Sequence, residues 1–424
     1  MSARPAITVV GIGADGCLSL TSRAMNAVSS AQVLVGGERQ LAFFAEFAGQ
    51  RIVLKDGVLA ALREVEELAA DNNVCILASG DPLFFGIGSL VMRQFGVQHV
   101  DIIPQPSSVQ WAFARIGLKW DDAHFLSLHG RRRNEFITRV KAMNKVACLT
   151  DEEYSPGRIA SLLVEAGDTE WRAWVCEDLG SVEERVRSFE LAELAEQSEF
   201  RPLNILVLVR SNPDWRAPGM IPYLHEDAFA KRMPKKGLIT KREVRMLSLA
   251  ALRIRPDSVV WDIGAGSGSV SIEAALLAPR GRVYAVEVDA EGVAICRDNI
   301  RSHGVDNVTV VEGRAPAALA DLESPDAVFV GGSKGSLDAI IETSLDRLAP
   351  AGTLVVNAIT MENVADAYRG FRSRGFVPEV TLVNISRGVP LARYLRYEAL
   401  NPVHIISVTT PAASESARPD RGGM

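Results

Sequence analysis

Short apolar runs rich in β-branched residues recur through the first half of the chain and alternate with stretches of helical spacing. The first run, Ile7–Val10, ends in Gly11-Ile12-Gly13. Further strands are predicted at 32–35, 74–78, 100–103, 147–149, 171–176 and 204–209, with helices at 59–70 and 156–166. Strands that alternate with helices predict a mixed or parallel α/β sheet.

The second half alternates more strictly between strand and helix. Strands are predicted at 258–263, 282–287, 308–312, 327–330, 353–357, 379–384 and 404–409. Helices are predicted between them at 269–277, 291–302, 337–348 and 361–374. Short connections between such elements are typical of a doubly wound, Rossmann-like sheet.

The length and the distribution of chain breakers predict two domains. A chain of 424 residues exceeds the size at which a single core stops growing. Proline and glycine are dense in 211–237, which we interpret as a linker between a domain at 1–210 and a domain at 238–410. The segment 411–424 is small and polar, and we expect it to be a disordered tail. The halves share no motif, so they are a fusion rather than a duplication.

Composition narrows the class of protein. Hydrophobic residues make up 47% and charged residues 23%, as in soluble globular proteins. The five cysteines form no Cys-x-x-Cys pair, which disfavours a structural zinc site or a disulfide framework and fits a reducing cytoplasm. No stretch of about 18 residues is apolar enough to predict a membrane span. A net charge of −6 offers no general attraction for nucleic acid.

A glycine-rich turn in the second half is the strongest local signal for a ligand. The predicted strand at 258–263 runs into Gly264-Ala265-Gly266-Ser267-Gly268, with Asp262 just before it, and the next strand ends in Glu287. Glycine lets a backbone approach a ligand, the following helix N-terminus suits a carboxylate, and the acid can accept ribose hydroxyls. A turn without a ligand is the alternative, but the acid and the βα series favour a cofactor. The Gly-x-Gly-x-Gly spacing differs from a dinucleotide fingerprint and resembles the first motif of class I S-adenosylmethionine methyltransferases.

Several further motifs extend this resemblance over about 220–410. They are Ile239–Arg245, Trp261–Gly268, Gly313–Pro316, Val330–Ser333 and Asn401–Val403. Together they resemble the precorrin-6B C15-methyltransferases, the decarboxylating enzymes of cobalamin synthesis.

That resemblance implies roles for individual residues. Glu287 would hold the ribose, and the loop Gly313-Arg314-Ala315 would border the adenine. The loop Gly331-Gly332-Ser333 would present the substrate to the methyl group. Lys334 stands where a glycine is expected, and it either alters the floor of the pocket or points to solvent. The cofactor-binding candidates of this half are Asp262, Gly264, Gly266, Gly268, Glu287, Gly313, Arg314 and Ala315.

Three loops of the first half each follow a predicted strand: they contain Gly11–Gly13, Gly80–Asp81 and Ser107–Ser108. Each loop taken alone indicates only a turn. In their order they resemble the tetrapyrrole methylases, the class III methyltransferases, over about 5–210. The segments 117–120 and 127–131 resemble the C5-methylating branch of that family, although the usual Gly-x-Gly-Pro-Gly reads Gly13-Ala14-Asp15-Gly16 here. The resemblance implies a two-lobed α/β domain with the cofactor folded between its lobes. The cofactor-binding candidates are Gly11, Gly13, Gly80, Asp81, Ser107 and Ser108.

Basic residues and one histidine are the other candidates for chemistry. Histidine side chains ordinarily titrate near neutrality, which makes His129 a candidate general base, but a structural histidine is the favoured interpretation. Arg131, in Arg131-Arg132-Arg133, is equally compatible with solvated charge and with docking of substrate carboxylates. Four more cations are candidate substrate anchors, although surface charge is favoured for any one of them: Lys241, Arg242, Arg245 and Arg387.

The resemblances imply a cytoplasmic enzyme with one S-adenosylmethionine site per domain. The N-terminal domain would methylate C5 and the C-terminal domain C15 of precorrin-6B, a corrinoid precursor, with decarboxylation of the C12 acetate chain to give precorrin-8. The conjugated macrocycle can accept the electrons released, so no metal is expected. We expect a homo-oligomer with no nucleic-acid or membrane partner, and the catalytic base is not assigned.

Two other classes of function remain open. One is a methyltransferase for another tetrapyrrole, for RNA or for protein, although no basic surface supports a nucleic-acid substrate. The other is a non-catalytic tetrapyrrole-binding scaffold with decayed sites. Retention of Asp262, the three glycines and Glu287 in one motif argues against decay.

Overall fold

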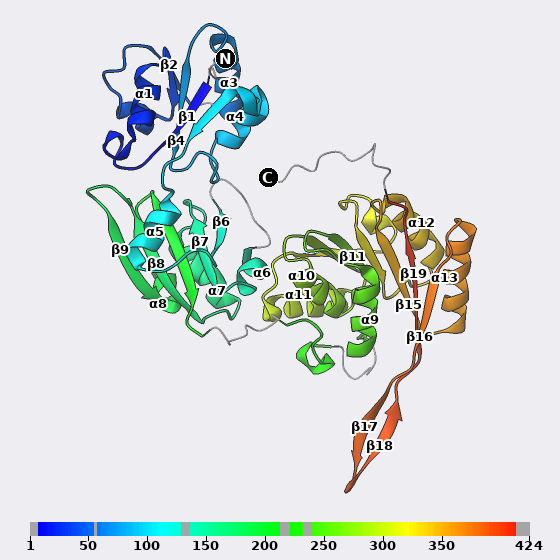
Figure 1. Ribbon diagram of the computed structural model, residues 1–424. Coiled ribbons are helices and arrows are strands. Elements are labelled where there is room, and N and C mark those ends of the chain that lie inside the picture. The colour runs from blue at the N-terminus through cyan, green and yellow to red at the C-terminus, as the bar shows by residue number, and fades with distance from the viewer. Residues whose placement is uncertain (1–6, 55–56, 129–135, 213–220, 232–238, 413–424) are drawn as a thin grey trace. The chain divides into compact units, whose positions relative to one another are not determined.

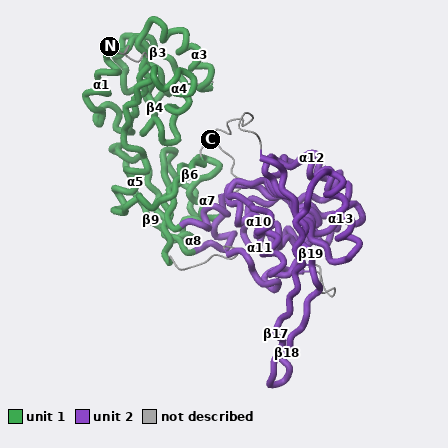
Figure 2. Tube along the Cα trace, turned by 45° about the vertical axis from the view of Figure 1, so that its right-hand side comes forward, with its two compact units in different colours: residues 1–132, 144–161, 170–213 green, residues 133–143, 162–169, 214–424 purple. Residues whose placement is uncertain are grey.

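The computed structural model describes residues 7–54, 57–128, 136–212, 221–231 and 239–412. The chain separates into two compact units, shown in Figure 2. Unit 1 comprises Met1–Arg132, Asn144–Ser161 and Glu170–Pro213, and unit 2 comprises Arg133–Met143, Leu162–Thr169 and Asp214–Met424. Predictions for His129, Arg131, most of the linker and the tail from residue 413 fall outside the described residues.

The first sheet of unit 1 is entirely parallel, in the order β3-β2-β4-β1-β5. Its strands are β1 (Ile7–Ile12), β2 (Val33–Gly36), β3 (Gln50–Val53), β4 (Val74–Ser79) and β5 (Val100–Ile103). Successive β1 side chains enter different cores, because they point to opposite faces of the sheet. Helices α3 (Val58–Leu68) and α4 (Gly88–Phe95) cover one face, and α1 (Ser22–Ser29) and α2 (Glu38–Ala42) cover the other. Burial on both faces explains the nearly continuous apolar runs from which β1, β2 and β4 were predicted. Strand β3 was not predicted, because three of its four residues are exposed.

The second sheet of unit 1 is mixed, in the order β6-β7-β10-β8-β9. Its strands are β6 (His124–Ser127), β7 (Lys145–Leu149), β8 (Trp171–Glu177), β9 (Arg185–Glu190) and β10 (Asn204–Arg210), and only the β6–β7 pair is parallel. Helix α5 (Ser108–Ile116) packs through Val109, Ala112 and Phe113 on this sheet. The remaining helices of this stretch of chain are α6 (Phe136–Lys141), α7 (Pro156–Glu165) and α8 (Leu191–Ala195).

Unit 2 is built on a seven-stranded sheet in the order β13-β12-β11-β14-β15-β19-β16. Its strands are β11 (Val259–Ile263), β12 (Arg282–Glu287), β13 (Val308–Glu312), β14 (Ala327–Val330), β15 (Thr353–Ala358), β16 (Glu379–Val383) and β19 (Val403–Thr409). Five neighbouring strands are parallel, and β19 is antiparallel to both of its neighbours. The order reverses between β11 and β14, where open α/β sheets form ligand crevices.

Helices cover both faces of this sheet (Figure 1). Helices α12 (Leu337–Arg347) and α13 (Met361–Ser373) share a core with one face. Helices α9 (Arg242–Leu252), α10 (Ser269–Leu277) and α11 (Ala290–His303) pack on the other. The predicted doubly wound, Rossmann-like class is therefore confirmed.

A hairpin that the alternation of the sequence did not predict follows β16. Its strands, β17 (Ser386–Leu391) and β18 (Tyr394–Ala399), pair only with each other and protrude from unit 2 in Figure 1. Four 3₁₀ turns complete the described elements: Cys17–Ser19, Val97–His99, Glu226–Ala228 and Ala317–Leu319. Within the described residues, no helix is long and apolar enough to cross a membrane.

Candidate active site

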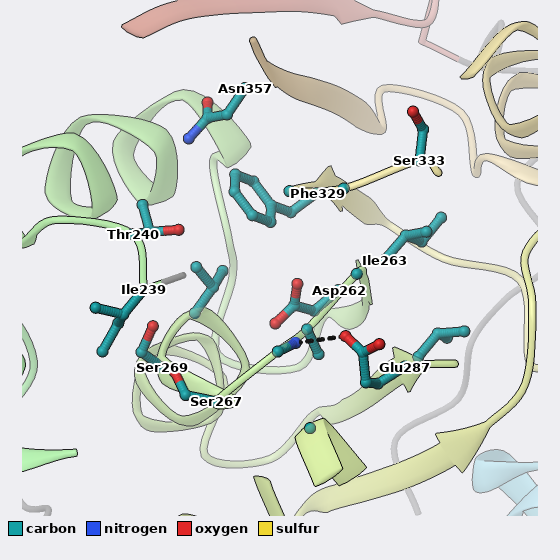
Figure 3. A pocket seen from close by; sticks show the side chains of 18 of the residues that line it. Ile239, Thr240, Asp262, Ile263, Ser267, Ser269, Glu287, Phe329, Ser333 and Asn357 are labelled. Carbon is teal, nitrogen blue, oxygen red and sulfur yellow. Dashed lines mark hydrogen bonds between the residues drawn. The ribbon is translucent and has the colours of Figure 1, made fainter. Parts of the chain in front are cut away.

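A cavity of about 580 Å³ opens in unit 2 at the carboxyl ends of β11, β12 and β14. Figure 3 shows its polar floor, with Asp262 and Glu287 close together and Phe329 above them. The structure brings most of the C-terminal candidates to this one cavity: Asp262, Gly264, Gly266, Glu287, Gly313, Arg314, Ala315, Gly331, Gly332 and Ser333. Gly268 does not line the cavity but caps α10 in a left-handed conformation.

The turn after β11 depends on glycine for two separate reasons. Gly264, Gly266 and Gly268 have φ values of 77°, 55° and 77°, a region that L-residues rarely adopt. A Cβ on Gly264 would lie 2.7 Å from the backbone nitrogen and oxygen of Gly332. Since backbone cannot yield as a flexible side chain does, this turn can approach the β14 loop only with glycine at 264.

Glu287 is held rigidly at the end of β12. One carboxylate oxygen accepts from the Gly266 amide at 2.8 Å, drawn as the dashed line in Figure 3. The other accepts from the amides of Val288 and Asp289 at 2.9 and 2.8 Å. These contacts tie the acid to the glycine turn and fix both oxygens beside the cavity, with lone pairs left for further donors.

Asp262 is almost completely buried, with 1% of its surface exposed. The Ser271 hydroxyl donates to its Oδ2, while Oδ1 has no hydrogen-bond partner among the described residues. Burial, assisted by the charge of Glu287, raises the pKa of Asp262 to about 7. An unsatisfied acceptor at the floor of a cavity is suited to a cationic donor from a ligand.

The cationic anchors proposed from sequence lie in different environments. Lys241 lines the cavity, whereas Arg242 lies beside Glu243 at 3.6 Å. The prediction fails for Arg245, which is neither a substrate anchor nor surface charge, because it is fully buried and its Nε lies 2.8 Å from Oε2 of Glu273. Arg387 is also not free to anchor a substrate.

Both guanidinium groups instead join parts of unit 2. Arg245 donates to the backbone carbonyls of Thr240 and Leu224. Arg387, at the base of the hairpin, donates to Glu226 and Glu243, and these hydrogen bonds help to hold the pKa of Glu226 near 2 despite its burial.

Sequence reasoning also missed residues on the far side of the cavity. Thr240, Phe329 and Asn357 line it from the segment before α9, from β14 and from β15 (Figure 3). Thr240 lies inside the Ile239–Arg245 motif that carried the family resemblance, but only the basic residues of that motif were named as candidates. Asn357 is a polar residue at a predicted strand end, and that position was the available signal.

In unit 1 the structure brings three candidate loops together. A Cβ on Gly11 would lie 2.2 Å from the carbonyl oxygen of Gly80, and one on Gly80 would lie 3.4 Å from the Cα of Ser107. Gly80 has a φ of 58°. The contacts require small residues and leave backbone groups at this sheet edge close to any ligand that binds there.

The polar side chains of these loops also support local structure. One Asp81 oxygen accepts from the Leu83 amide at 2.8 Å. Ser107 forms a capping box with Gln110 at the start of α5, and Ser108 is exposed. Gly13 lies one residue beyond β1 and bridges to Gly16.

Two family descriptions match the chain in separate parts. Residues 6–195 match the tetrapyrrole (corrin/porphyrin) methylases, and residues 231–410 match the precorrin methyltransferase domain. A Sinorhizobium protein named precorrin-6Y C(5,15)-methyltransferase [decarboxylating] is 36% identical over 84% of this chain and 86% of its own.

Two shorter relatives are each named for only one of these two methylated positions. A Pyrobaculum calidifontis protein named probable cobalt-precorrin-6B C(15)-methyltransferase (decarboxylating) is 42% identical over 40% of this chain and 87% of its own. A Salmonella typhimurium protein named cobalt-precorrin-7 C(5)-methyltransferase is 34% identical over 47% of this chain and 98% of its own. The two positions named together in the first relative are thus named separately in these two proteins.

Proposed function

The chain belongs to the precorrin-6Y C(5,15)-methyltransferase (decarboxylating) family, and from this membership we propose that it methylates a precorrin at C5 and C15 and removes one carboxyl group in cobalamin biosynthesis. The observation that carries the proposal is the cavity of unit 2, where a glycine turn, a fixed Glu287 and an unsatisfied Asp262 oxygen meet. Each feature matches one part of S-adenosylmethionine.

We propose that different residues of this cavity bind different parts of the cofactor. The Glu287 oxygens accept the two ribose hydroxyls, and Asp262 Oδ1 accepts from the amino acid ammonium. The N-terminus of α10 faces the carboxylate, and Gly313, Arg314 and Ala315 border the adenine. When bound, S-adenosylmethionine supplies an electrophilic methyl group and its own leaving group.

The protein's contribution to methyl transfer is then alignment and exclusion of water. Ile239, Val244, Phe329 and Ile340 supply apolar wall to the cavity. The Gly331-Gly332-Ser333 loop after β14 supports a proposal that the macrocycle is presented there. A Cβ on Gly332 would meet nothing within 4 Å, so its surroundings are open enough for a flat substrate.

We propose a second S-adenosylmethionine site in unit 1, formed by the loops of Gly11–Gly13, Gly80–Asp81 and Ser107–Ser108. The close approach of Gly11, Gly80 and Ser107 supports it, because it brings the backbones of three loops together at one sheet edge. We assign C5 methylation to the domain at 1–210, and C15 methylation with decarboxylation to the domain at 238–410. Arg131 remains a proposed substrate contact on the resemblance alone.

Isothermal titration with S-adenosylhomocysteine tests the cofactor assignment. Two binding sites per chain are expected. A single site would contradict the proposal of one site per domain, and no binding would contradict methyl transfer from this cofactor.

We also propose that the protein is a homo-oligomer. The hairpin exposes Leu391, Tyr394, Leu395 and Tyr397, each with more than half of its surface accessible. Apolar side chains on a protruding element suit contact with a second copy. Light scattering on the purified protein should give a molar mass two or more times the 45.9 kDa of one chain. The molar mass of a monomer would contradict the proposal. All five cysteines are free thiols, which supports a cytoplasmic location.

A further inference from the structure

Three cationic side chains lie around the cavity of unit 2: Lys241, Arg314 and Lys334. In the described ranges, none of the three is paired with a carboxylate, whereas the nearby Arg245 and Arg387 both are. Unpaired cations beside a concave site are available for an anionic ligand.

Lys334 is held in a conformation that usually requires glycine. Its φ is 45°, its neighbour Gly335 has a φ of 88°, and its side chain is exposed. Its carbonyl oxygen accepts from Nη1 of Arg314 at 3.4 Å, which links these two cations on one side of the cavity. Backbone strain at a site rim is often retained for the sake of the side chain that it displays.

Lys241 belongs to the other side of the cavity. Figure 3 places Thr240 and Ser333, the residues that precede Lys241 and Lys334, at opposite sides of the view. The carbonyl of Thr240 accepts from Nη1 of Arg245 at 2.7 Å, and Arg245 is itself fixed by Glu273. The backbone just before Lys241 is therefore anchored from within the core.

We propose that Lys334, whose backbone Arg314 supports, and Lys241 form a carboxylate-binding subsite that binds peripheral carboxylates of the macrocycle from two sides. This inference rests on the proposed function, because a substrate that is decarboxylated carries at least one carboxylate. The acids Asp262 and Glu287 lie at the floor of the cavity. The proposed subsite therefore places the substrate cations apart from the acids of the cofactor region. Such an arrangement orients a polyacid with its charged edge away from the floor.

Three variants test Lys334. Lys334→Gly removes the charge and relieves the left-handed backbone, so the variant is expected to fold. Lys334→Arg retains the charge. Arg253→Gly is the matched control, because Arg253 is also an exposed cation with a left-handed φ of 51°, but it does not line the cavity.

Steady-state C15 methylation of the precorrin substrate and titration with S-adenosylhomocysteine are measured on each full-length variant. Lys334→Gly is expected to raise KM about tenfold with kcat nearly unchanged, since a charged contact made equally in ground and transition states is lost. Lys334→Arg should recover most of the wild-type KM, and Arg253→Gly should match wild type. Affinity for S-adenosylhomocysteine should be unchanged in all three.

The outcomes separate this subsite from the proposed function. An unchanged KM in Lys334→Gly, or an equal rise in Arg253→Gly, overturns the subsite while methylation by the wild-type chain stands. A wild-type chain that neither binds S-adenosylhomocysteine nor methylates a precorrin overturns the proposed function itself.

Discussion

Glu287 offers a residue-scale test of the cofactor assignment, with its control on the neighbouring strand. Glu287→Gln keeps the shape but loses one acceptor oxygen, and we expect affinity for S-adenosylhomocysteine at the unit 2 site to fall about tenfold or more, as for loss of a charge-assisted hydrogen bond. Glu312 is the register partner of Glu287 on β13 and does not line the cavity, so Glu312→Gln should bind normally. Titration calorimetry measures both, and equal affinities would remove Glu287 from the site.

Asp262 makes cofactor affinity depend on pH. Burial raises its pKa from 3.8 to about 7, so below pH 7 the unliganded folded protein holds a proton that an incoming ammonium must displace. Affinity for S-adenosylhomocysteine should therefore fall by about tenfold per pH unit below 7, the slope for one displaced proton. The same shift makes the unliganded fold lose stability as pH rises from about 4 to about 7, because the unfolded chain ionises first.

Asp262→Asn provides the comparison for that pH dependence. It should bind more weakly at pH 8 and show a flat affinity between pH 6 and pH 8, since no proton is displaced from residue 262. A slope equal to that of the wild type would assign the titration to another group.

Single residues were predictable from sequence where local geometry defines their role. The glycines and Glu287 were found because a turn and a strand end have recognisable spacing. Arg245 was not, because its partner Glu273 lies on another helix and only packing brings the two together. Asn357 ends a predicted strand, but only the fold shows that this strand end lines the cavity.

At the scale of elements, the approach of the β11 turn to the β14 loop is the critical contact of unit 2. Gly264→Ala would place a methyl group 2.7 Å from the Gly332 backbone, and we expect a loss of about 2 kcal/mol or more of stability together with weaker cofactor binding. Gly335→Ala meets the same kind of backbone strain, with φ 88°, but nothing lies within 4 Å of its new Cβ. Thermal unfolding with and without S-adenosylhomocysteine compares the two variants. Equal effects would show that strain alone, rather than the contact, matters.

Strands buried on both faces were predictable, whereas exposed strands were found only where β-branched residues gather, as in β13 and β16. The strands β11, β12 and β14 are almost wholly buried and gave clear apolar runs. Strand β9 and the hairpin strand β18 are largely exposed, so their sequences lack such a run. Helix α9 was not predicted, and the polar residues Arg245 and Ser248 interrupt the apolar pattern of its buried face.

At the scale of the whole molecule, we propose that two methyl transfers take place at two separate cofactor sites in one chain. The glycine-edged loops of unit 1 and the cavity of unit 2 are built from different parts of the sequence. Substitutions in such separate sites usually act independently. The two-domain order was predictable because each half has its own pattern of strands and its own motif.

The mass of the product made from purified precorrin-6B tests this claim most directly. The wild-type chain should add two methyl groups with loss of carbon dioxide. Asp81→Ala should add one methyl group and still lose carbon dioxide, and Gly266→Val should lose C15 methylation while C5 methylation continues. If either variant, with its fold intact, abolishes every change in mass, the two sites do not act independently and the central claim is contradicted.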